Sequence, residues 1–577
     1  MRTALRTGLT GLGAAFAVVA TSAFAGVTTI EDAKPGDWPS YHRTYDSQRF
    51  SPLTQINRKN VGKMNVAWVH QAGEITQGLQ VTPIAVDGVI YYSGSYNRTF
   101  AVDGRNGNEL WHYYPKILDG VDKLPVGPYS RGVAVANGKV YIGTIDGRAI
   151  ALDQKTGKVA WETQLVDTLK CGCMFTSPPL AVKDKVIYGS TQGGIPARGG
   201  GIFGVDQNTG KQEWYFDPVK EGDEHWGVND FGEPSSKYAG VGAWHVGSYD
   251  KDLDLIYYGT SNPSPWFDWG APGEGRNGFM RENGVGARPG DNLYSSSVLA
   301  LRPDTGELVW YHQEHPHDDW DFDSTLGEFV LINDGNKKLM IHQAKSGYVY
   351  IYDRTNGKVQ NAWSINKYVT FVKSVDPKTG ELIGRNPPVT GKDNMFCPSM
   401  LGGRSWNPGS YNPDMKVWFN SRQEMCEIAK TRPEKPQLDP LPAWYAGADL
   451  KWVHPPGEKA FGAIDAWDPL TGKKKWTVTD KYPRISGILS TKGGLVFSGD
   501  MKGYLYAYDA DNGKQLWSFN MGSGTRGGII SYTAGGEQYI LAPSGIGSAA
   551  QAITASLYPE VGEFPAGASL FAFKVPK

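Results

Sequence analysis

The chain has 577 residues, with 58 basic and 59 acidic side chains, so its formal net charge is −1. This balance produces no field that would attract nucleic acid or an anionic membrane, which argues against a function of that kind. Aromatic residues make up 12% of the chain, with 19 Trp and 73 Gly, a composition typical of stacked sheets joined by tight turns.

The first 25 residues read as a secretory signal peptide. Arg2 and Arg6 precede an apolar run from Leu9 to Ala20, and residues 23–25 form a small-x-small cleavage site. The run is too short to span a bilayer, and no Cys follows it for lipid attachment, so we expect no membrane anchor. We expect a mature periplasmic protein of residues 26–577, in a compartment that permits disulfides.

One short pattern recurs along the mature chain: a strand that usually ends near Asp, a turn that ends in Gly, and Trp four residues later. A recurrence of about 40–50 residues built from such hairpins is typical of propeller blades. The sequence therefore predicts an all-β propeller, with eight blades favoured and seven as the alternative. The clear copies are 101–111, 151–161, 204–214, 300–310, 466–476 and 507–517, and the weaker ones are 351–359 and 376–382.

The other predicted elements follow in chain order. Residues 26–65 are expected to form turns and a short helix, 66–69 the first strand and 570–575 the closing strand. Two stretches near 215–297 and 387–452 interrupt the rhythm and are rich in Gly, Asn or Pro. Long irregular insertions on a rigid scaffold are frequent places for function.

Together with the ordered Trp copies, two segments resemble one family. These are DWPSYHRTYDSQRFSPLTQIN at 37–57 and PHDDWDFD at 316–323. They resemble the quinoprotein alcohol dehydrogenases over essentially the whole mature chain. The resemblance implies a periplasmic eight-bladed enzyme that holds pyrroloquinoline quinone (PQQ) and a metal ion. It also implies oxidation of an alcohol to an aldehyde or ketone by hydride transfer to PQQ.

The resemblance also implies the catalytic and metal residues. Asp321 matches the catalytic carboxylate, which would take the alcohol proton or hold the metal. Asn262 matches an amide ligand, and hard cations prefer oxygen donors. Asp323 stands where the family's lanthanide-using members carry an extra Asp. Because Asp321 and Asp323 supply two carboxylates, the charge count leaves Ca²⁺ and a lanthanide(III) open, and Asp323 favours the lanthanide.

Other matches would hold the cofactor. Trp244 matches an indole stacked under the PQQ plane. Arg131 would pair with a PQQ carboxylate, and Lys345 would polarise the reactive carbonyl as the second catalytic residue. The further matches are Gln80, where the family often has Glu, Gly487, and the hydroxyl groups of Thr176 and Thr191. The alternative for the two threonines is that they are ordinary strand residues.

The cysteines fall into two pairs. Cys397 and Cys426 resemble a disulfide pair of the family. Cys171 and Cys173 flank one Gly, and they are read either as a tight disulfide or as two free thiols. The sequence contains no C-x-x-C-H, so no covalent c-type haem is expected. A separate soluble cytochrome c would then accept the electrons. The oligomeric state stays open, with a homodimer as one option.

Several departures from the family pattern imply a reshaped pocket. Gly194 stands where the family has a metal-binding Glu, Pro125 and Val126 replace two adjacent cysteines, and Ile485 replaces an indole. We expect a wider, more apolar entrance, suited to a bulky primary or secondary alcohol rather than methanol. Two alternatives stay open: a non-catalytic exported scaffold of the outer-membrane-assembly type, and a PQQ-like fold that has lost metal binding with its Glu.

Overall fold

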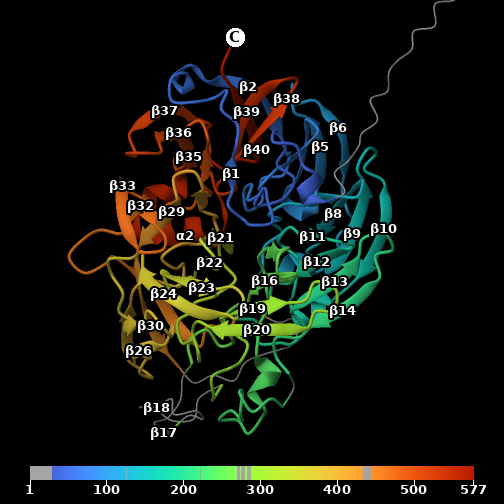
Figure 1. The fold of residues 1–577 in the computed structure, drawn as a ribbon. Helices are drawn as coiled ribbons and strands as arrows, with labels where there is room; N and C mark the ends of the chain where they lie inside the picture. Colours follow the sequence, from blue (N-terminus) through green and yellow to red (C-terminus); the bar gives the residue numbers. More distant parts are fainter. Residues whose placement is uncertain are drawn as a thin grey trace, which may run out of the picture.

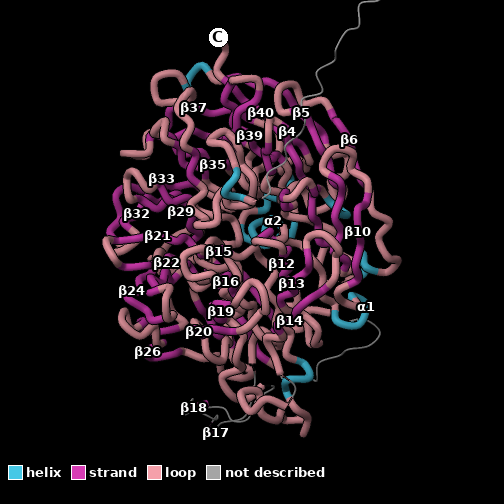
Figure 2. Tube along the Cα trace, turned by 45° about the vertical axis from the view of Figure 1, so that its right-hand side comes forward, coloured by secondary structure: helices cyan, strands magenta, loops and turns pink. Residues whose placement is uncertain are grey.

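The computed structural model describes residues 29–577 apart from 125, 221, 269–272, 275–279, 282–287 and 433–442. The signal peptide predicted at 1–25 and the departure at Pro125 lie outside these residues. Strands dominate the described chain, and helices are few (Figure 2). The α-helices are Thr168–Cys171 (α1) and Ser548–Leu557 (α2). Over the described ranges, no helix has the length and apolar character needed to cross a membrane.

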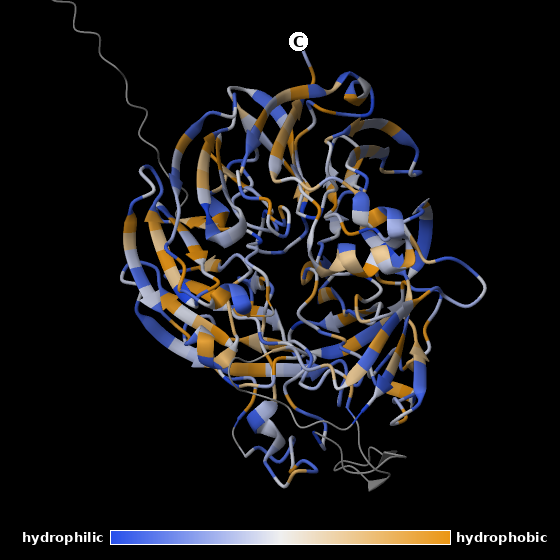
Figure 3. Cartoon of the chain, turned by 180° about the vertical axis from the view of Figure 1, so that it is seen from behind, coloured by the Kyte–Doolittle hydropathy of each residue, from blue (hydrophilic) through white to orange (hydrophobic). Residues whose placement is uncertain are grey.

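Eight sheets, each with four antiparallel strands, follow one another around a common centre among the described residues, and one of them gains a fifth, parallel strand (Figures 1 and 3). Their strands, in chain order, are Ile84–Val86 (β3), Val89–Ser93 (β4), Thr99–Asp103 (β5) and Glu109–Tyr113 (β6); Ala134–Ala136 (β7), Lys139–Gly143 (β8), Arg148–Asp153 (β9) and Val159–Gln164 (β10); Leu180–Val182 (β11), Lys185–Gly189 (β12), Ile202–Asp206 (β13) and Gln212–Phe216 (β14); Ser248–Asp250 (β15), Leu255–Gly259 (β16), Ser297–Leu301 (β19) and Leu308–Gln313 (β20); Val330–Asp334 (β21), Lys337–Gln343 (β22), Tyr348–Asp353 (β23) and Lys358–Ser364 (β24); Ser410–Asn412 (β28), Val417–Glu424 (β29), Phe461–Asp468 (β32) and Lys473–Asp480 (β33); Leu489–Thr491 (β34), Leu495–Gly499 (β35), Tyr504–Asp509 (β36) and Gln515–Asn520 (β37); and Ile530–Ala534 (β38), Glu537–Ser544 (β39), Ser569–Lys574 (β40) and Asn65–Gln71 (β2).

The last sheet joins the two ends of the mature chain. Strand β2 pairs antiparallel with β40, and His70 lies opposite Leu570. The predicted strands at 66–69 and 570–575 are therefore confirmed, and they belong to one sheet. Because an early strand completes a late sheet, the ring closes through backbone hydrogen bonds.

Eight tryptophans tie each sheet to the next. The indole N–H of each donates to a backbone carbonyl at or near the outer hairpin of the following sheet, and the last of these bonds returns to the residue before β2. The pairs are Trp68 to Gly104 (2.9 Å), Trp111 to Gln154 (3.0 Å), Trp161 to Gln207 (3.0 Å), Trp214 to Pro303 (2.9 Å), Trp310 to Arg354 (3.1 Å), Trp363 to Pro469 (2.9 Å), Trp476 to Ala510 (3.0 Å) and Trp517 to Met64 (3.1 Å).

In seven of these eight contacts, the docked indole also covers the glycine of the hairpin. Gly357 has φ +73°, and a Cβ there would lie 2.5 Å from Cε3 of Trp310. The backbone region and the close approach of the ring both exclude a side chain. The recurring turn glycine and the recurring Trp are thus two halves of one interaction. The same relation holds for Gly107, Gly157, Gly210, Gly306, Gly472 and Gly513.

Two details of the predicted organisation were wrong. The weak copy at 376–382 lies in a separate two-stranded hairpin of Val372–Val375 (β25) and Leu382–Arg385 (β26), outside the four-stranded sheets. The eighth docking indole is instead Trp68, which no hairpin turn precedes, because the strand that pairs with β2 is β40 at the other end of the chain. The weak copy at 351–359 does form a blade hairpin, between β23 and β24.

The two stretches predicted as irregular are only partly so. The first, 215–297, includes β15 and β16, and the second, 387–452, includes β28 and β29. Five further short strands of these stretches form two small sheets outside the ring. These are Gly273–Glu274 (β17) with Met280–Arg281 (β18), and Asp393–Phe396 (β27), Cys426–Thr431 (β30) and Ala448–Val453 (β31) in the order β27-β30-β31.

The segment 36–51 crosses one end of the central axis. It includes Phe50–Ser51 (β1), which pairs parallel with β34. Arg49 is fully buried and donates to the carbonyls of Ile488 and Ile529. The segment contacts the first strand of seven sheets, through β1 and through hydrogen bonds that involve Ala85, Ala181, Tyr249, Leu331, Tyr411 and Thr533. It therefore closes the ring on that side.

We predict that Gly357→Ala lowers the free energy of unfolding by about 2–4 kcal/mol, because the new methyl group both strains φ and overlaps the docked indole. Gly335→Ala is the matched control: Gly335 has φ +59° in a hairpin with nothing within 4 Å of an added Cβ. That change is expected to cost only about 1 kcal/mol. Urea unfolding midpoints measure the difference, and equal shifts would show that indole contact does not stabilise the ring.

Candidate functional site

Two adjoining cavities of ≈ 230 and ≈ 170 Å³ lie on the axis, inside the ring. Both are lined by Tyr129, Arg131, Trp244, Lys345, Met400, Trp444 and Ala549. Gln80 lines the larger cavity. The structure therefore brings most of the residues proposed from sequence to one place. Those at the smaller cavity are Arg131, Thr176, Thr191, Trp244, Asn262, Asp321, Asp323 and Lys345.

Asp321, Asp323 and Lys345 form the charged centre of the smaller cavity. Lys345 Nζ lies 2.9 Å from an oxygen of Asp321 and 3.0 Å from one of Asp323. Burial raises the pKa of Asp321 and Asp323 adds to this rise, whereas the Lys345 ammonium opposes it. Burial lowers the pKa of Lys345, but the two carboxylates outweigh this effect and raise it. The two buried carboxylates thus share the single ammonium group of Lys345.

The loop around Asp321 is held in an uncommon conformation. Asp321 has φ +63°, in the left-handed region that non-glycine residues rarely adopt. The buried Asp318 carboxylate holds this turn, because it accepts the backbone N–H groups of Trp320 (2.9 Å) and Phe322 (2.7 Å). Burial raises the pKa of Asp318 to about 6. Asp318 is a positioning residue that the sequence analysis did not single out.

Three oxygen-bearing side chains of the smaller cavity form a ligand set for a hard cation. The backbone N–H of Asn262 donates to Asp323 (2.7 Å), and its side-chain N–H donates to the Pro263 carbonyl (3.0 Å). The side-chain amide oxygen of Asn262 faces Gly193, where an added Cβ would lie 2.5 Å away. This oxygen and the carboxylates of Asp321 and Asp323 fit a Ca²⁺ or lanthanide ion by donor type.

Gly194, one of the departures from which a wider, more apolar entrance is expected, opens no extra space. Gly194 has φ +71°, and an added Cβ would lie 1.3 Å from Nε1 of Trp266. The indole of Trp266 therefore fills the space that a side chain at 194 would need. Trp266 lines the cavity and contacts Trp444, with ring centroids 5.9 Å apart. Where the family has the carboxylate of a metal-binding Glu, this chain has the indole of Trp266. The pocket is therefore more apolar at this point than the family pattern, but it is not wider there.

Two buried guanidinium groups face the larger cavity. Arg131 donates to the Thr176 hydroxyl (2.7 Å) and lies over the rings of Trp244 and Trp406, at 5.0 and 4.8 Å. Arg526 lies 5.4 Å from the same Trp406 ring. Burial lowers the pKa of both arginines, and for Arg526, where the Arg131 charge adds to the effect, it reaches about 9. Two nearby cations favour an anion between them.

A flat tricarboxylate such as PQQ fits this wall. The indole of Trp244 supplies a stacking face, and Arg131 and Arg526 supply charged donors. Within the described residues, Nε of both arginines and the Ser548 hydroxyl are buried without a hydrogen-bond partner. Buried polar groups are normally satisfied, so these atoms point to an oxygen-rich ligand.

The sequence analysis missed Arg526 and Trp406. A signal for Arg526 was present, because Thr525-Arg526-Gly527 before β38 matches Ser130-Arg131-Gly132 before β7. No comparable signal singles out Trp406 among 19 tryptophans.

Two proposed positions lie away from the cavity walls. Gly487 donates its backbone N–H to Gly527 (3.2 Å), beside Arg526, and it lines neither of the two cavities. Ile485 packs with Met501 and Ile546 in an apolar cluster behind the wall, and Met400, which lines both cavities, packs against this cluster. Val126, by contrast, does line the smaller cavity.

Both cysteine pairs are disulfide-bonded, with Cα–Cα distances of 5.1 Å for Cys171–Cys173 and 4.4 Å for Cys397–Cys426. The first bond adjoins the cavity wall: Gln192 donates to the Cys171 carbonyl (2.8 Å), and the Thr191 hydroxyl accepts the Met174 N–H (2.9 Å). Of the two interpretations of Cys171 and Cys173, the structure supports the bond.

Comparison with known proteins gives a consistent result. Residues 38–368 and 458–540 match the family model described as PQQ: glucose/ethanol/alcohol dehydrogenase, beta-propeller domain. The quinohemoprotein alcohol dehydrogenase ADH IIB of Pseudomonas putida is 37% identical, over 95% of this chain and 79% of the relative. The quinoprotein ethanol dehydrogenase of Pseudomonas aeruginosa is 32% identical, over 98% of this chain and 94% of the relative.

Solved structures agree. The quinohemoprotein alcohol dehydrogenase ADHIIG of Pseudomonas putida HK5 superimposes with a TM-score of 0.83 at 32% identity, covering 94% of this chain and 80% of that chain. A europium-containing methanol dehydrogenase superimposes with a TM-score of 0.82 at 28% identity, covering 94% and 98%.

We predict that Arg526→Gln weakens PQQ binding by about 10- to 100-fold, because a hydrogen bond to a charged group contributes about 1.5–3 kcal/mol. Titration of the cofactor-free protein, followed by quenching of tryptophan fluorescence, measures the dissociation constant. Arg105→Gln, on an exposed hairpin, is the control. An unchanged dissociation constant for Arg526→Gln would remove Arg526 from the cofactor site.

Proposed function

The chain belongs to the family of PQQ-dependent alcohol dehydrogenases, and we propose that it oxidises a bulky primary or secondary alcohol to an aldehyde or ketone. The observation that carries the proposal is the cavity itself. Asp321 and Lys345 form an ion pair in the smaller cavity, which Asn262, Asp323 and Trp244 also line. The family resemblance implies the same set of residues. An eight-bladed propeller accounts for the eight sheets.

The residues of this chain divide the chemistry between them. PQQ, when bound, accepts the hydride from the alcohol carbon. Asp321 accepts the alcohol proton, and the raised pKa that burial gives it suits a general base. Lys345 holds its ammonium beside the reacting atoms and stabilises negative charge that develops there. Arg131, Arg526 and Trp244 orient the cofactor, and the buried walls limit access of water.

We propose that a metal ion is held by Asn262, Asp321 and Asp323. The three oxygen donors suit Ca²⁺ or a lanthanide, and the second Asp favours the trivalent ion because it adds a negative charge. The wall at Gly194 contributes no carboxylate, since Trp266 occupies that place. The europium-containing neighbour is consistent with this choice of ion.

The mouth of the cavity supports a bulky apolar substrate. Val126, Ile195, Met400, Trp266 and Trp444 line the smaller cavity, and Trp444 is 42% exposed at its edge. Apolar side chains at the mouth favour an alcohol with an apolar or aromatic group. Methanol would leave most of this surface without contact.

We further propose periplasmic export and transfer of electrons to a separate cytochrome c. The basis is the leader at 1–25 and the lack of a C-x-x-C-H segment in the sequence. The oligomeric state, including a homodimer, stays a prediction. The alternative of a non-catalytic scaffold is set aside, because relatives 32–37% identical over most of the chain are dehydrogenases.

We predict that Asp321→Asn lowers alcohol oxidation by about 10²–10⁴-fold, the usual contribution of a group that transfers a proton. The amide keeps the size of the side chain, so PQQ binding should change little. Dye-linked turnover with saturating PQQ and metal measures the effect, and Asp334→Asn, at the exposed end of β21, is the control. Near-native turnover of Asp321→Asn would refute its role.

We predict that Asp323→Ala weakens lanthanide activation far more than Ca²⁺ activation, because the trivalent ion depends more on each anionic oxygen. Titrating the variant with La³⁺ and with Ca²⁺ in the same alcohol assay measures both constants. Equal losses with the two ions, or no loss with either, would show that Asp323 does not select the metal.

A further inference from the structure

A group of buried polar side chains lies next to Trp244 and lines neither of the two cavities. His245 follows Trp244 directly, and His42 belongs to the segment that closes the axis. Their ring centroids are 6.3 Å apart, and the ring of Tyr41 lies 4.8 Å from His42 and 5.2 Å from His245. The three rings therefore form one cluster on the axis, defined here as the axial cluster.

The ring nitrogens of this cluster have few protein partners. In the described part of the chain, both ring nitrogens of His42 and both of His245 are buried, and the one protein group that bonds to either ring is the backbone of Val246, at His245. Leaving the other ring nitrogens dry would cost several kcal/mol. Water is the partner that satisfies them, since it both donates and accepts in a polar site.

On one side, the axial cluster contacts side chains that line the larger cavity. The ring of His245 lies 6.4 Å from that of Trp406, which lines the cavity, and 6.3 Å from Trp244. On the same side, the hydroxyl of Tyr41 lies beside that of Thr82, whose backbone N–H donates to the Arg131 carbonyl (3.0 Å). The indoles of Trp244 and Trp406 are thus the side chains that lie between His245 and the cavities.

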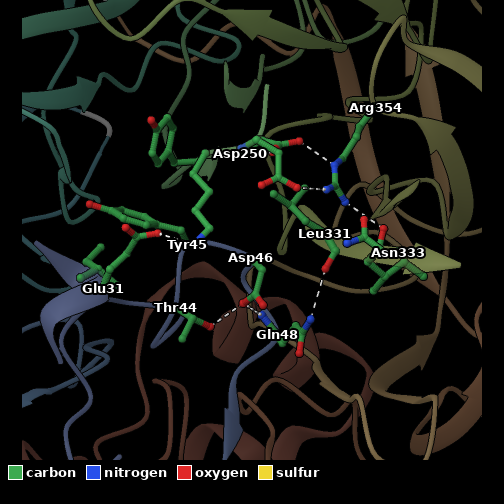
Figure 4. Close-up of a pocket in the computed structure, with 14 residues that line it drawn as sticks. Glu31, Thr44, Tyr45, Asp46, Gln48, Asp250, Leu331, Asn333 and Arg354 are labelled. Atoms are coloured by element: carbon green, nitrogen blue, oxygen red, sulfur yellow. Dashed lines mark hydrogen bonds and ion pairs between the residues drawn. The ribbon is translucent and has the colours of Figure 1, made fainter. Parts of the chain in front are cut away.

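On the other side, the cluster borders a small cavity that shares two lining residues with a pocket open to solvent. A small cavity of ≈ 10 Å³, about the space of one water, is lined by Tyr41, His42, Thr44 and Tyr45. Thr44 and Tyr45 also line the open pocket of ≈ 330 Å³ shown in Figure 4. Asp46 lies inside this pocket and accepts from Thr44 and Gln48, and burial raises its pKa. Exposed Glu31 lies on its rim (Figure 4).

We propose that His42 and His245, with intervening water, conduct protons along the axis from the floor of the cofactor cavity to the pocket of Figure 4. This inference rests on the proposed function. Each alcohol oxidised to its carbonyl compound yields two electrons and two protons; the electrons leave to the acceptor, and the protons must leave a buried cavity for solvent. Asp46 and the other acids of the pocket are the groups that receive them.

The electrostatic surroundings disfavour a resting imidazolium, so a proton would pass through each ring in one concerted step. Burial lowers the pKa of both histidines, and Arg49, Arg131 and Arg404 lower it further, so each ring is neutral near pH 7. A neutral imidazole accepts a proton at one nitrogen and releases one at the other. The positive field is moderated, because Arg404 pairs with Glu328 (3.2 Å) and Arg49 bonds to backbone carbonyls.

The test uses His42→Gln and His245→Gln, which keep polar side chains but cannot carry a proton. His112→Gln, on the half-exposed outer strand β6, is the control. With PQQ and metal bound, we expect steady-state turnover to fall by at least about tenfold in each test variant, with a larger solvent deuterium isotope effect. The single-turnover rate of hydride transfer, measured with deuterated alcohol, should not change.

A second measurement needs no activity. A crystal structure at about 2 Å resolution should show ordered waters on the ring nitrogens of His42 and His245, leading to the small cavity. Dry nitrogens, or variants with wild-type turnover and isotope effect, would overturn the relay and assign proton exit to the cavity mouth at Trp444. Failure of the wild-type protein to oxidise any alcohol would instead refute the proposed function, whatever the waters show.

Discussion

The fold depends on one repeated contact, between an indole on the outer strand of one sheet and the hairpin glycine of the next. The contact combines a hydrogen bond to a carbonyl with a ring that covers an α-carbon, as for Trp310 with Arg354 and Gly357. Since each sheet alone has an exposed face, docking of neighbours builds a continuous core. The last docking bond, from Trp517 to Met64, joins the end of the chain to its beginning. A closed ring follows, and with it a fixed axis.

The axis is what allows distant residues to form one site. Arg131, Trp244, Asp321, Lys345 and Arg526 span nearly 400 positions of the sequence, yet all line the same pair of cavities. Each lies near the inner end of a sheet, where the strands of a propeller converge. The segment that includes Arg49 closes one end, so the opposite end serves as the mouth. At the proposed catalytic centre, Asp321 and Asp323 outweigh the charge of Lys345 by one, which suits a bound cation. At the proposed cofactor wall, Arg131 and Arg526 are positive, which suits an anionic cofactor.

The sequence predicted the architecture well because its repeat is a local pattern. The hairpin glycine and the Trp lie four residues apart, so each copy is visible without knowledge of the fold. Trp68 was missed because its strand pairs with β40 at the far end of the chain, so no hairpin turn precedes it. The 376–382 hairpin was misassigned because a tight turn alone does not identify a blade. Asp321, Asn262 and Lys345 were proposed through family resemblance; residue type alone would not have distinguished them. The filling of the space at Gly194 by Trp266 could not be predicted, since it depends on how two separate loops meet.

The most direct test of the central claim is an absorbance titration of the cofactor-free protein with PQQ, in the presence of La³⁺ or Ca²⁺, followed by addition of an alcohol. We predict binding of one PQQ per chain with a quinone absorbance band, and bleaching of that band by a bulky alcohol in the absence of any other oxidant. Binding without bleaching by any of a panel of primary and secondary alcohols, or no binding with either ion, would contradict the assignment of this chain as a PQQ-dependent alcohol dehydrogenase.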